Sequence, residues 1–148
     1  MKLYLGQFDS FPGHILLEAG PDDICVEFEG LVGIDSAELE LDIQKSGEEF
    51  YCQGTTRASV RLTCARCLEE FDQELAGTTD FIVCSKEWRE SHRDITDNEE
   101  YVFFEGSDLQ ADVSDIVREA IIVELAMKPL CSENCRGLCS RCGANLNE

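Results

Sequence analysis

The chain has 148 residues, of which 43% are apolar and 8% are aromatic. This composition is typical of a globular protein, and the length predicts a single domain over 1–148 with a real hydrophobic core. No stretch approaches the run of about 20 apolar residues that a membrane helix needs, and the N-terminus turns polar too early for a secretory signal. We therefore expect a cytoplasmic protein with no membrane partner.

The first half of the chain predicts β-structure. Residues 1–35 hold short apolar pieces broken by Gly and Pro, which indicate strands and irregular loops. Residues 36–84 predict antiparallel strands, and 37–44 give the clearest case because apolar and polar residues alternate there with a period of two. Short turns join these strands, so the simplest assembly is an antiparallel meander, either open or barrel-like.

A polar segment and a helix follow. Residues 85–100 are almost wholly polar and predict a surface loop. Residues 112–127 predict a helix that Asp112 caps and that Pro129 ends. The fold class is therefore α+β, with this C-terminal helix covering one face of the sheet through an apolar stripe of Val113, Ile116, Val117, Ala120, Ile121 and Leu125.

Nine cysteines in a reducing compartment predict metal binding rather than disulfides, and an odd number cannot be fully paired within one chain. Three of them, Cys25, Cys52 and Cys84, stand alone, and we interpret these as free buried thiols. The other six are grouped. Two lie in the first pair, and four lie in a cysteine-rich tail, or knuckle, at 131–148: Cys64 and Cys67, then Cys131, Cys135, Cys139 and Cys142.

A Cys-x-x-Cys pair lets two thiolates reach one ion from a tight turn. We favour one structural zinc ion over an iron–sulfur cluster, because four soft thiolates suit zinc. Two ligand sets and a metal-free alternative of reduced structural thiols remain open. The preferred set is Cys64, Cys67, Cys139 and Cys142, and the other is the local group of Cys131, Cys135, Cys139 and Cys142.

The charge is unevenly distributed. Against 31 acidic residues the chain has only 12 Lys and Arg, which gives a net charge of −19. Nevertheless, 55–68 and 128–142 carry six basic residues and only one acidic residue, and they coincide with the cysteine groups. A chance arrangement of solvated side chains is the alternative. The candidates for RNA contact are Arg57, Arg61, Arg66, Lys128, Arg136 and Arg141.

Catalytic motifs are missing from the sequence. It contains no Gly-rich phosphate loop and no nucleophile elbow. With only two histidines, acid–base catalysis by His has little support. We therefore expect no enzyme and no small-molecule substrate.

Three phrases, CARCLEEF, DVSDIVREAIIVELAMKPLC and CRGLCSRCGANLN, occur in this order between about 36 and 147. In these phrases the chain resembles the YceD family, the large ribosomal RNA subunit accumulation proteins. The resemblance implies a bacterial factor that supports synthesis, processing or stability of large-subunit ribosomal RNA. It also marks candidate structural or contact residues: Cys64, Arg66, Cys67, Gly137, Cys139, Cys142, Gly143, Asn145 and Asn147.

Charge and resemblance together give one hypothesis: the basic, cysteine-bearing face contacts large-subunit ribosomal RNA or its precursor through phosphates. The acidic remainder would meet a basic ribosomal protein or avoid unproductive RNA contact. Two rival hypotheses stay open. One is an acidic adaptor or holdase for a basic ribosomal protein, and the other is a thiol or metal sensor, which needs cysteines of lowered pKa.

Overall fold

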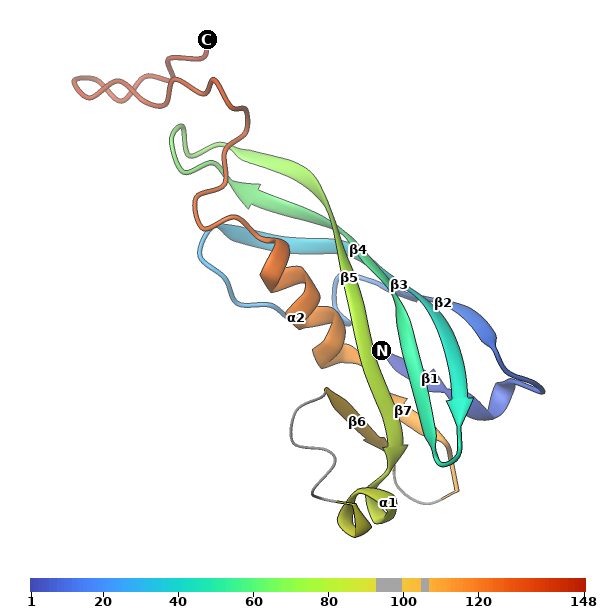
Figure 1. Ribbon diagram of the computed structural model, residues 1–148. Helices are drawn as coiled ribbons and strands as arrows, with labels where there is room; N and C mark the ends of the chain where they lie inside the picture. The colour runs from blue at the N-terminus through green and yellow to red at the C-terminus, as the bar shows by residue number, and fades with distance from the viewer. Residues whose placement is uncertain (93–99, 105–106) are drawn as a thin grey trace.

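The computed structural model describes residues 1–92, 100–104 and 107–148. Its main element is a five-stranded sheet in the order β2-β3-β4-β5-β6 (Figure 1). The strands are β2 Gly13–Ala19, β3 Leu31–Ser46, β4 Glu49–Thr63, β5 Glu70–Ser85 and β6 Tyr101–Phe104. Neighbours from β2 to β5 run antiparallel, whereas β6 runs parallel to β5.

Five further elements complete the described chain. A second, two-stranded sheet pairs the N-terminal strand with a strand just before the C-terminal helix. The elements are β1 Lys2–Tyr4, the 3₁₀-helix η1 Leu5–Gln7, α1 Lys86–Ser91, β7 Gln110–Asp112 and α2 Ser114–Glu124. None of the helices in the described ranges has the length and apolar character required to cross a membrane.

The α+β class and the antiparallel run of strands are confirmed, but the barrel-like alternative is wrong. Within the described residues, β2 pairs only with β3 and β6 only with β5, so the five-stranded sheet is open at both edges. The alternation in β3 explains why closure is unnecessary. Its core-facing residues Ala37, Leu39, Leu41 and Ile43 are buried against other core residues on one face, while the other face stays polar.

Helix α2 covers the core-facing side of β4 and β5, where its residues Ile116, Val117 and Ile121 are buried (Figure 1). The helix is shorter than the predicted 112–127. At its start Val113 occupies the cap position instead of the predicted Asp112, whose carboxylate accepts a hydrogen bond from the Ser114 N–H at 3.0 Å. At its end Leu125 turns into an extended conformation and buries its side chain in the core, which stops the helix before 127.

The predicted surface loop at 85–100 is wrong for its first part, which forms α1 and stays largely exposed. The Ser85 hydroxyl accepts a hydrogen bond from the Trp88 N–H at 3.1 Å, and Glu87 lies in the first turn, so a serine cap starts a short helix in a polar sequence. Residues 93–99 of the predicted loop lie outside the described residues.

The long antiparallel pair of β4 and β5 positions the first cysteine pair. The two strands are in register to their ends, where Thr63 lies opposite Glu70. The connection between them carries Cys64 and Cys67 and lies at one end of the sheet. Figure 1 shows the chain beyond α2 running to this same end, so the tail and the connection meet there.

Candidate metal centre

The connection between β4 and β5 is closed by its own backbone. The Cys64 N–H donates to the Glu69 carbonyl at 2.8 Å, and the Leu68 N–H donates to the Cys64 carbonyl at 3.0 Å. Leu68 has a φ of 63°, a left-handed conformation that is unfavourable for a leucine. The loop therefore holds a strained residue directly after the second cysteine, where the chain turns back into β5.

One backbone contact attaches the tail to this loop. The Ala65 N–H donates to the Pro129 carbonyl at 2.7 Å. Beside it, Gly30 has a φ of +88°, and its position for a Cβ lies only 3.3 Å from the Pro129 ring. The Gly30 carbonyl in turn accepts a hydrogen bond from the Thr63 N–H at 2.7 Å. These contacts bring the first residues of the tail beside the cysteine loop.

Four cysteine sulfurs converge at this junction. The Sγ atoms of Cys64 and Cys135 lie 3.7 Å apart, as do those of Cys67 and Cys131. All four sulfurs lie within 4.8 Å of one another, and none forms a disulfide. With Zn–S bonds of about 2.3 Å, a tetrahedral ion separates neighbouring sulfurs by roughly 3.8 Å. The four thiols therefore have the spacing that a single tetrahedral ion requires.

Hydrogen bonds to sulfur favour the thiolate at two of the four positions. Burial opposes ionisation of Cys64, but N–H donors that include the Arg66 backbone at 3.5 Å outweigh it and lower the pKa of this thiol to about 6. The Asn147 side-chain amide donates to Cys135 Sγ at 3.3 Å and is the main reason that the pKa of Cys135 is also lowered. Both residues are thus prepared to bind a cation.

The other two thiols resist ionisation in the absence of a cation. Desolvation and the neighbouring thiols raise the pKa of Cys131 to about 12, and the pKa of Cys67 is raised as well. Four thiolates within 4.8 Å repel one another unless a cation lies between them. A divalent ion would remove this penalty, so the group can hold one metal ion and would release protons on binding it.

Three residues that the motifs marked without a role surround this centre, one in the β4–β5 connection and two in the tail. The Arg66 guanidinium donates to the Cys135 carbonyl at 3.0 Å. Gly137 has a φ of +76°, and a Cβ there would lie 3.2 Å from the Arg66 carbonyl oxygen. The Asn147 side-chain Oδ1 accepts a hydrogen bond from the Arg136 backbone N–H at 2.9 Å. Arg66, Gly137 and Asn147 therefore hold the backbone around Cys135 against the β4–β5 connection.

The structure does not assemble the preferred ligand set, nor the local one. Cys131 and Cys135 join Cys64 and Cys67, whereas Cys139 and Cys142 lie outside the group. The reason is the hydrogen bond from the Ala65 N–H to the Pro129 carbonyl, which brings only the start of the tail to the β4–β5 connection. The following residues turn away as a narrow hairpin, in which Leu138 bridges to Asn145 (Figure 1).

The lone cysteines differ among themselves. Cys52 and Cys84 are buried, as expected, and burial raises their pKa values to about 12 and about 11. Cys25 is exposed, so its interpretation as a buried thiol is wrong. It lies in the segment between β2 and β3, where its carbonyl accepts a hydrogen bond from the Arg118 guanidinium while the side chain faces outward.

Folding separates the six candidate RNA-contact residues into three groups. Arg57 and Arg61 lie on the uncovered sheet face, where each is 3.1 Å from a carboxylate, that of Glu40 and that of Asp72 respectively. Arg66 faces the thiol centre. Within the described parts of the chain, no ion pair involves the three exposed cations of 128–142, which are called the tail cations below: Lys128, Arg136 and Arg141.

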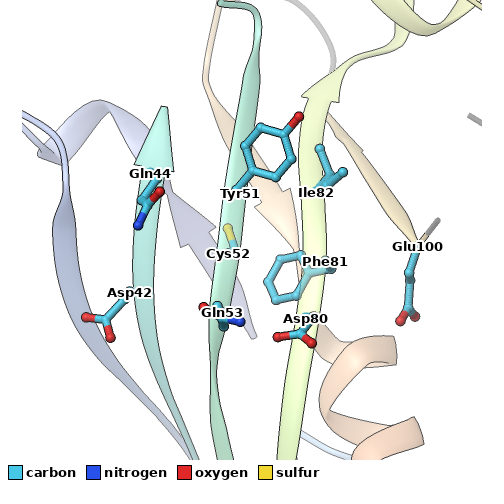
Figure 2. A pocket seen from close by; sticks show the side chains of 9 residues that line it. All are labelled: Asp42, Gln44, Tyr51, Cys52, Gln53, Asp80, Phe81, Ile82 and Glu100. Carbon is cyan, nitrogen blue, oxygen red and sulfur yellow. The ribbon is translucent and has the colours of Figure 1, made fainter. Parts of the chain in front are cut away.

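The sheet face opposite α2 carries an acidic groove that the sequence interpretation missed. Figure 2 shows Asp42, Gln53 and Asp80 side by side on β3, β4 and β5, in agreement with their register. The groove has a volume of about 510 Å³, and no Lys or Arg of the described residues lines it. In the sequence, only the polar residues at the outward-facing positions of the strands could have indicated this groove. The remaining lining residues are Gln44, Tyr51, Cys52, Phe81, Ile82 and Glu100.

Comparisons with known proteins agree on one family. Residues 52–148 match the family described as large ribosomal RNA subunit accumulation protein YceD. Two relatives carry the name large ribosomal RNA subunit accumulation protein YCED homolog 1, chloroplastic. The one from Zea mays is 24% identical and the match covers 74% of this chain and 45% of the relative. The one from Arabidopsis thaliana is 22% identical and the match covers 75% of this chain and 41% of the relative.

A third relative is an uncharacterized protein of Mycobacterium leprae, which is 27% identical over 73% of this chain and 48% of its own length. The chain therefore spans less than half the length of these curated relatives. No solved structure matches the chain.

Proposed function

Because the chain belongs to the YceD family of large ribosomal RNA subunit accumulation proteins, we propose that it is a non-enzymatic cytoplasmic factor that supports accumulation of large-subunit ribosomal RNA. It acts by binding that RNA or its precursor through the cysteine-rich tail. The observation that carries this proposal is the position of Lys128, Arg136 and Arg141. All three are exposed, and the segment that carries them also carries Cys131 and Cys135, whose sulfurs lie beside those of Cys64 and Cys67 at the end of the sheet.

The metal in this proposal is structural zinc. Four thiolates that share one ion suit zinc, whereas those of a four-iron cluster each bind a different iron and lie farther apart. Here all four sulfurs lie within 4.8 Å of one another. The ion would bind the β4–β5 connection to the tail, and its role would be to hold the three cations in one orientation.

The charge distribution after folding supports the tail rather than the sheet as the RNA contact. Arg57 and Arg61 are already neutralised by Glu40 and Asp72, so releasing them to bind phosphate would cost their ion pairs. The three tail cations have no such competitor among the described residues. Each phosphate that a cation neutralises releases counterions, so this binding should weaken as salt rises.

The test compares two charge-reversal variants in binding to a large-subunit ribosomal RNA precursor at several salt concentrations. The tail variant carries Lys128→Glu, Arg136→Glu and Arg141→Glu, and the matched control carries Arg57→Glu and Arg61→Glu. We expect the tail variant to lose at least about tenfold in affinity and to lower the salt slope by roughly two, as expected for about three lost phosphate contacts to single-stranded RNA. Unchanged binding by a tail variant that retains its metal would overturn the RNA contact.

The acidic groove favours a second candidate function, that of an adaptor for a basic ribosomal protein. Asp42, Asp80 and Glu100 line it, no lysine or arginine of the described residues does, and the partner of Asp42 is His14, whose Nδ1 lies 2.8 Å from Asp42 Oδ1. An Asp42→Lys and Asp80→Lys variant should then lose binding to purified basic proteins of the large subunit while RNA binding is retained. If no such protein binds the wild-type chain at low salt, this candidate is rejected.

A further inference from the structure

A second pair of thiols lies apart from the four-thiol centre. Cys139 and Cys142 are both free, and they occupy the turn of the C-terminal hairpin. The hairpin is held by the bridge between Leu138 and Asn145 and by the Leu146 N–H, which donates to the Gly137 carbonyl at 2.9 Å. Because the centre is complete with four other cysteines, this pair has no function in it.

The turn around this pair is closed like the loop of the first cysteine pair. The Cys139 N–H donates to the Ala144 carbonyl at 2.8 Å, and the Gly143 N–H donates to the Cys139 carbonyl at 2.9 Å. Gly143 has a φ of +73°, which allows this closure without strain. The backbone N–H groups of Arg141 and Cys142 face the Cys139 sulfur and lower the pKa of Cys139. The pair thus presents two preorganised ligands for a soft ion.

Two thiolates are only half of a tetrahedral site. Among the described residues, the only group of three or more candidate ligand atoms is the four-thiol centre, so no third ligand of this chain joins Cys139 and Cys142. Cys139 is partly exposed and Cys142 is exposed. The missing ligands can therefore come from another molecule, and the same pair on a second copy supplies two thiolates in a symmetric arrangement.

We propose that Cys139 and Cys142 are half of a second zinc site, and that the same two cysteines of a second copy complete it, so that one ion bridges two chains. The surface around the pair suits such a contact. Leu138 and Leu146 are large apolar residues that are 36% and 43% exposed on the same hairpin. Arg141, which lies between the two cysteines, would offset the negative charge of four thiolates around one divalent ion.

The experiment measures zinc content and molecular mass of the purified chain, under reductant throughout. The proposal predicts a dimer with about 1.5 zinc ions per chain, one in each four-thiol centre and one shared. Cys142→Ser should give a monomer with about 1.0 zinc ion per chain. Cys25→Ser, which removes an exposed lone thiol, should match the wild type.

Several results would overturn this inference. They are a wild-type monomer with about 1.0 zinc ion, a monomer with about 2.0, or a dimer that Cys142→Ser leaves intact. The reductant excludes a disulfide-linked dimer as the cause of the mass. This inference is independent of the RNA proposal, because the Cys142→Ser monomer retains the four-thiol centre and all three tail cations.

Discussion

Asn147 connects the end of the chain to the thiol centre through two hydrogen bonds. Its side-chain Nδ2 donates to Cys135 Sγ, and its side-chain Oδ1 accepts from the Arg136 backbone N–H. Groups that bond to metal ligands orient those ligands and tune their affinity. Asn147, which the family resemblance marked without a role, is therefore part of the candidate metal site.

Asn147→Ala should weaken zinc binding by about 10- to 100-fold. The loss should be larger at pH 6 than at pH 8. Without the Asn147 donor the pKa of Cys135 rises, so below that pKa more protons compete with the ion. Competition with a chelator across this pH range measures the effect. Ser140→Ala, at an exposed position of the same hairpin, serves as control, and equal affinities for both variants would contradict the role of Asn147.

The identity of the ligands can be tested with single cysteine variants. Cys131→Ser should remove the ion of the four-thiol centre, because serine leaves only three thiolates, and should lower the thermal stability of the tail contact. Cobalt absorption in the thiolate charge-transfer region provides the measurement, and only the ion that two chains share at Cys139 and Cys142 should remain. If Cys131→Ser retained a four-thiolate spectrum while Cys139→Ser lost it, the preferred set from the sequence would be correct and the geometric assignment wrong.

The motifs predicted which residue types form the site but could not predict how they pair. Cys64 and Cys67 were identified because a Cys-x-x-Cys spacing is itself a local signal. Which cysteines join this pair depends on the hydrogen bond between the Ala65 N–H and the carbonyl of Pro129, a residue 64 positions away in sequence. No local pattern records such a contact, and the Cys139-x-x-Cys142 spacing favoured the other pair.

At the scale of elements, α2 packs on β4 and β5 and encloses part of the hydrophobic core. The side chain of Ile121 is 1% exposed between the helix and the sheet, whereas that of Val123, two residues later, is 79% exposed. The two side chains have similar chemistry but opposite environments. This contrast separates the contribution of core packing from that of helix propensity.

Ile121→Ala should lower the free energy of unfolding by about 3 kcal/mol, because it removes buried methyl groups and leaves a cavity. Val123→Ala should change it by less than about 0.5 kcal/mol. Urea denaturation of both variants in the zinc-loaded form gives the comparison. A similar loss in both would mean that α2 does not pack on the sheet through this face.

Two glycines provide a second test at this scale. At Gly54 in β4, a Cβ would lie 1.8 Å from the Glu40 carbonyl oxygen, whereas at Gly33 in β3 nothing lies within 4 Å of that position. Gly54→Ala should therefore destabilise the protein by about 3 kcal/mol through backbone displacement. Gly33→Ala should be close to neutral, and an equally tolerant Gly54 would contradict the close approach of β3 and β4.

Alternation in sequence predicted the strands well where one face is buried. The residues around Leu39 and Leu41 show this, since both are fully buried and both were expected to face the core. The helix α1 was missed because its six residues bury no side chain, and without an apolar stripe only the Ser85 cap could have indicated it. Strand β6 pairs in parallel with β5, which local turns cannot specify.

For the whole molecule, folding redistributes the charge that the sequence shows. The net charge is −19, but Arg57 and Arg61 form ion pairs with Glu40 and Asp72 on the sheet face. The three tail cations have no ion pair among the described residues, and the tail lies at the end of the molecule where the thiol centre is (Figure 1). The acidic groove of Figure 2 lies on the uncovered face of the sheet instead. The molecule thus separates a candidate RNA contact from a candidate contact for basic protein.

The most direct test of this account is the ratio of large- to small-subunit ribosomal RNA in cells that lack the gene. The cells are complemented with the wild type, with the tail variant Lys128→Glu, Arg136→Glu and Arg141→Glu, or with the Arg57→Glu and Arg61→Glu control. The account predicts that deletion lowers the ratio and that the wild type and the control restore it, whereas the tail variant does not. An unchanged ratio after deletion, or full restoration by the tail variant, would contradict it.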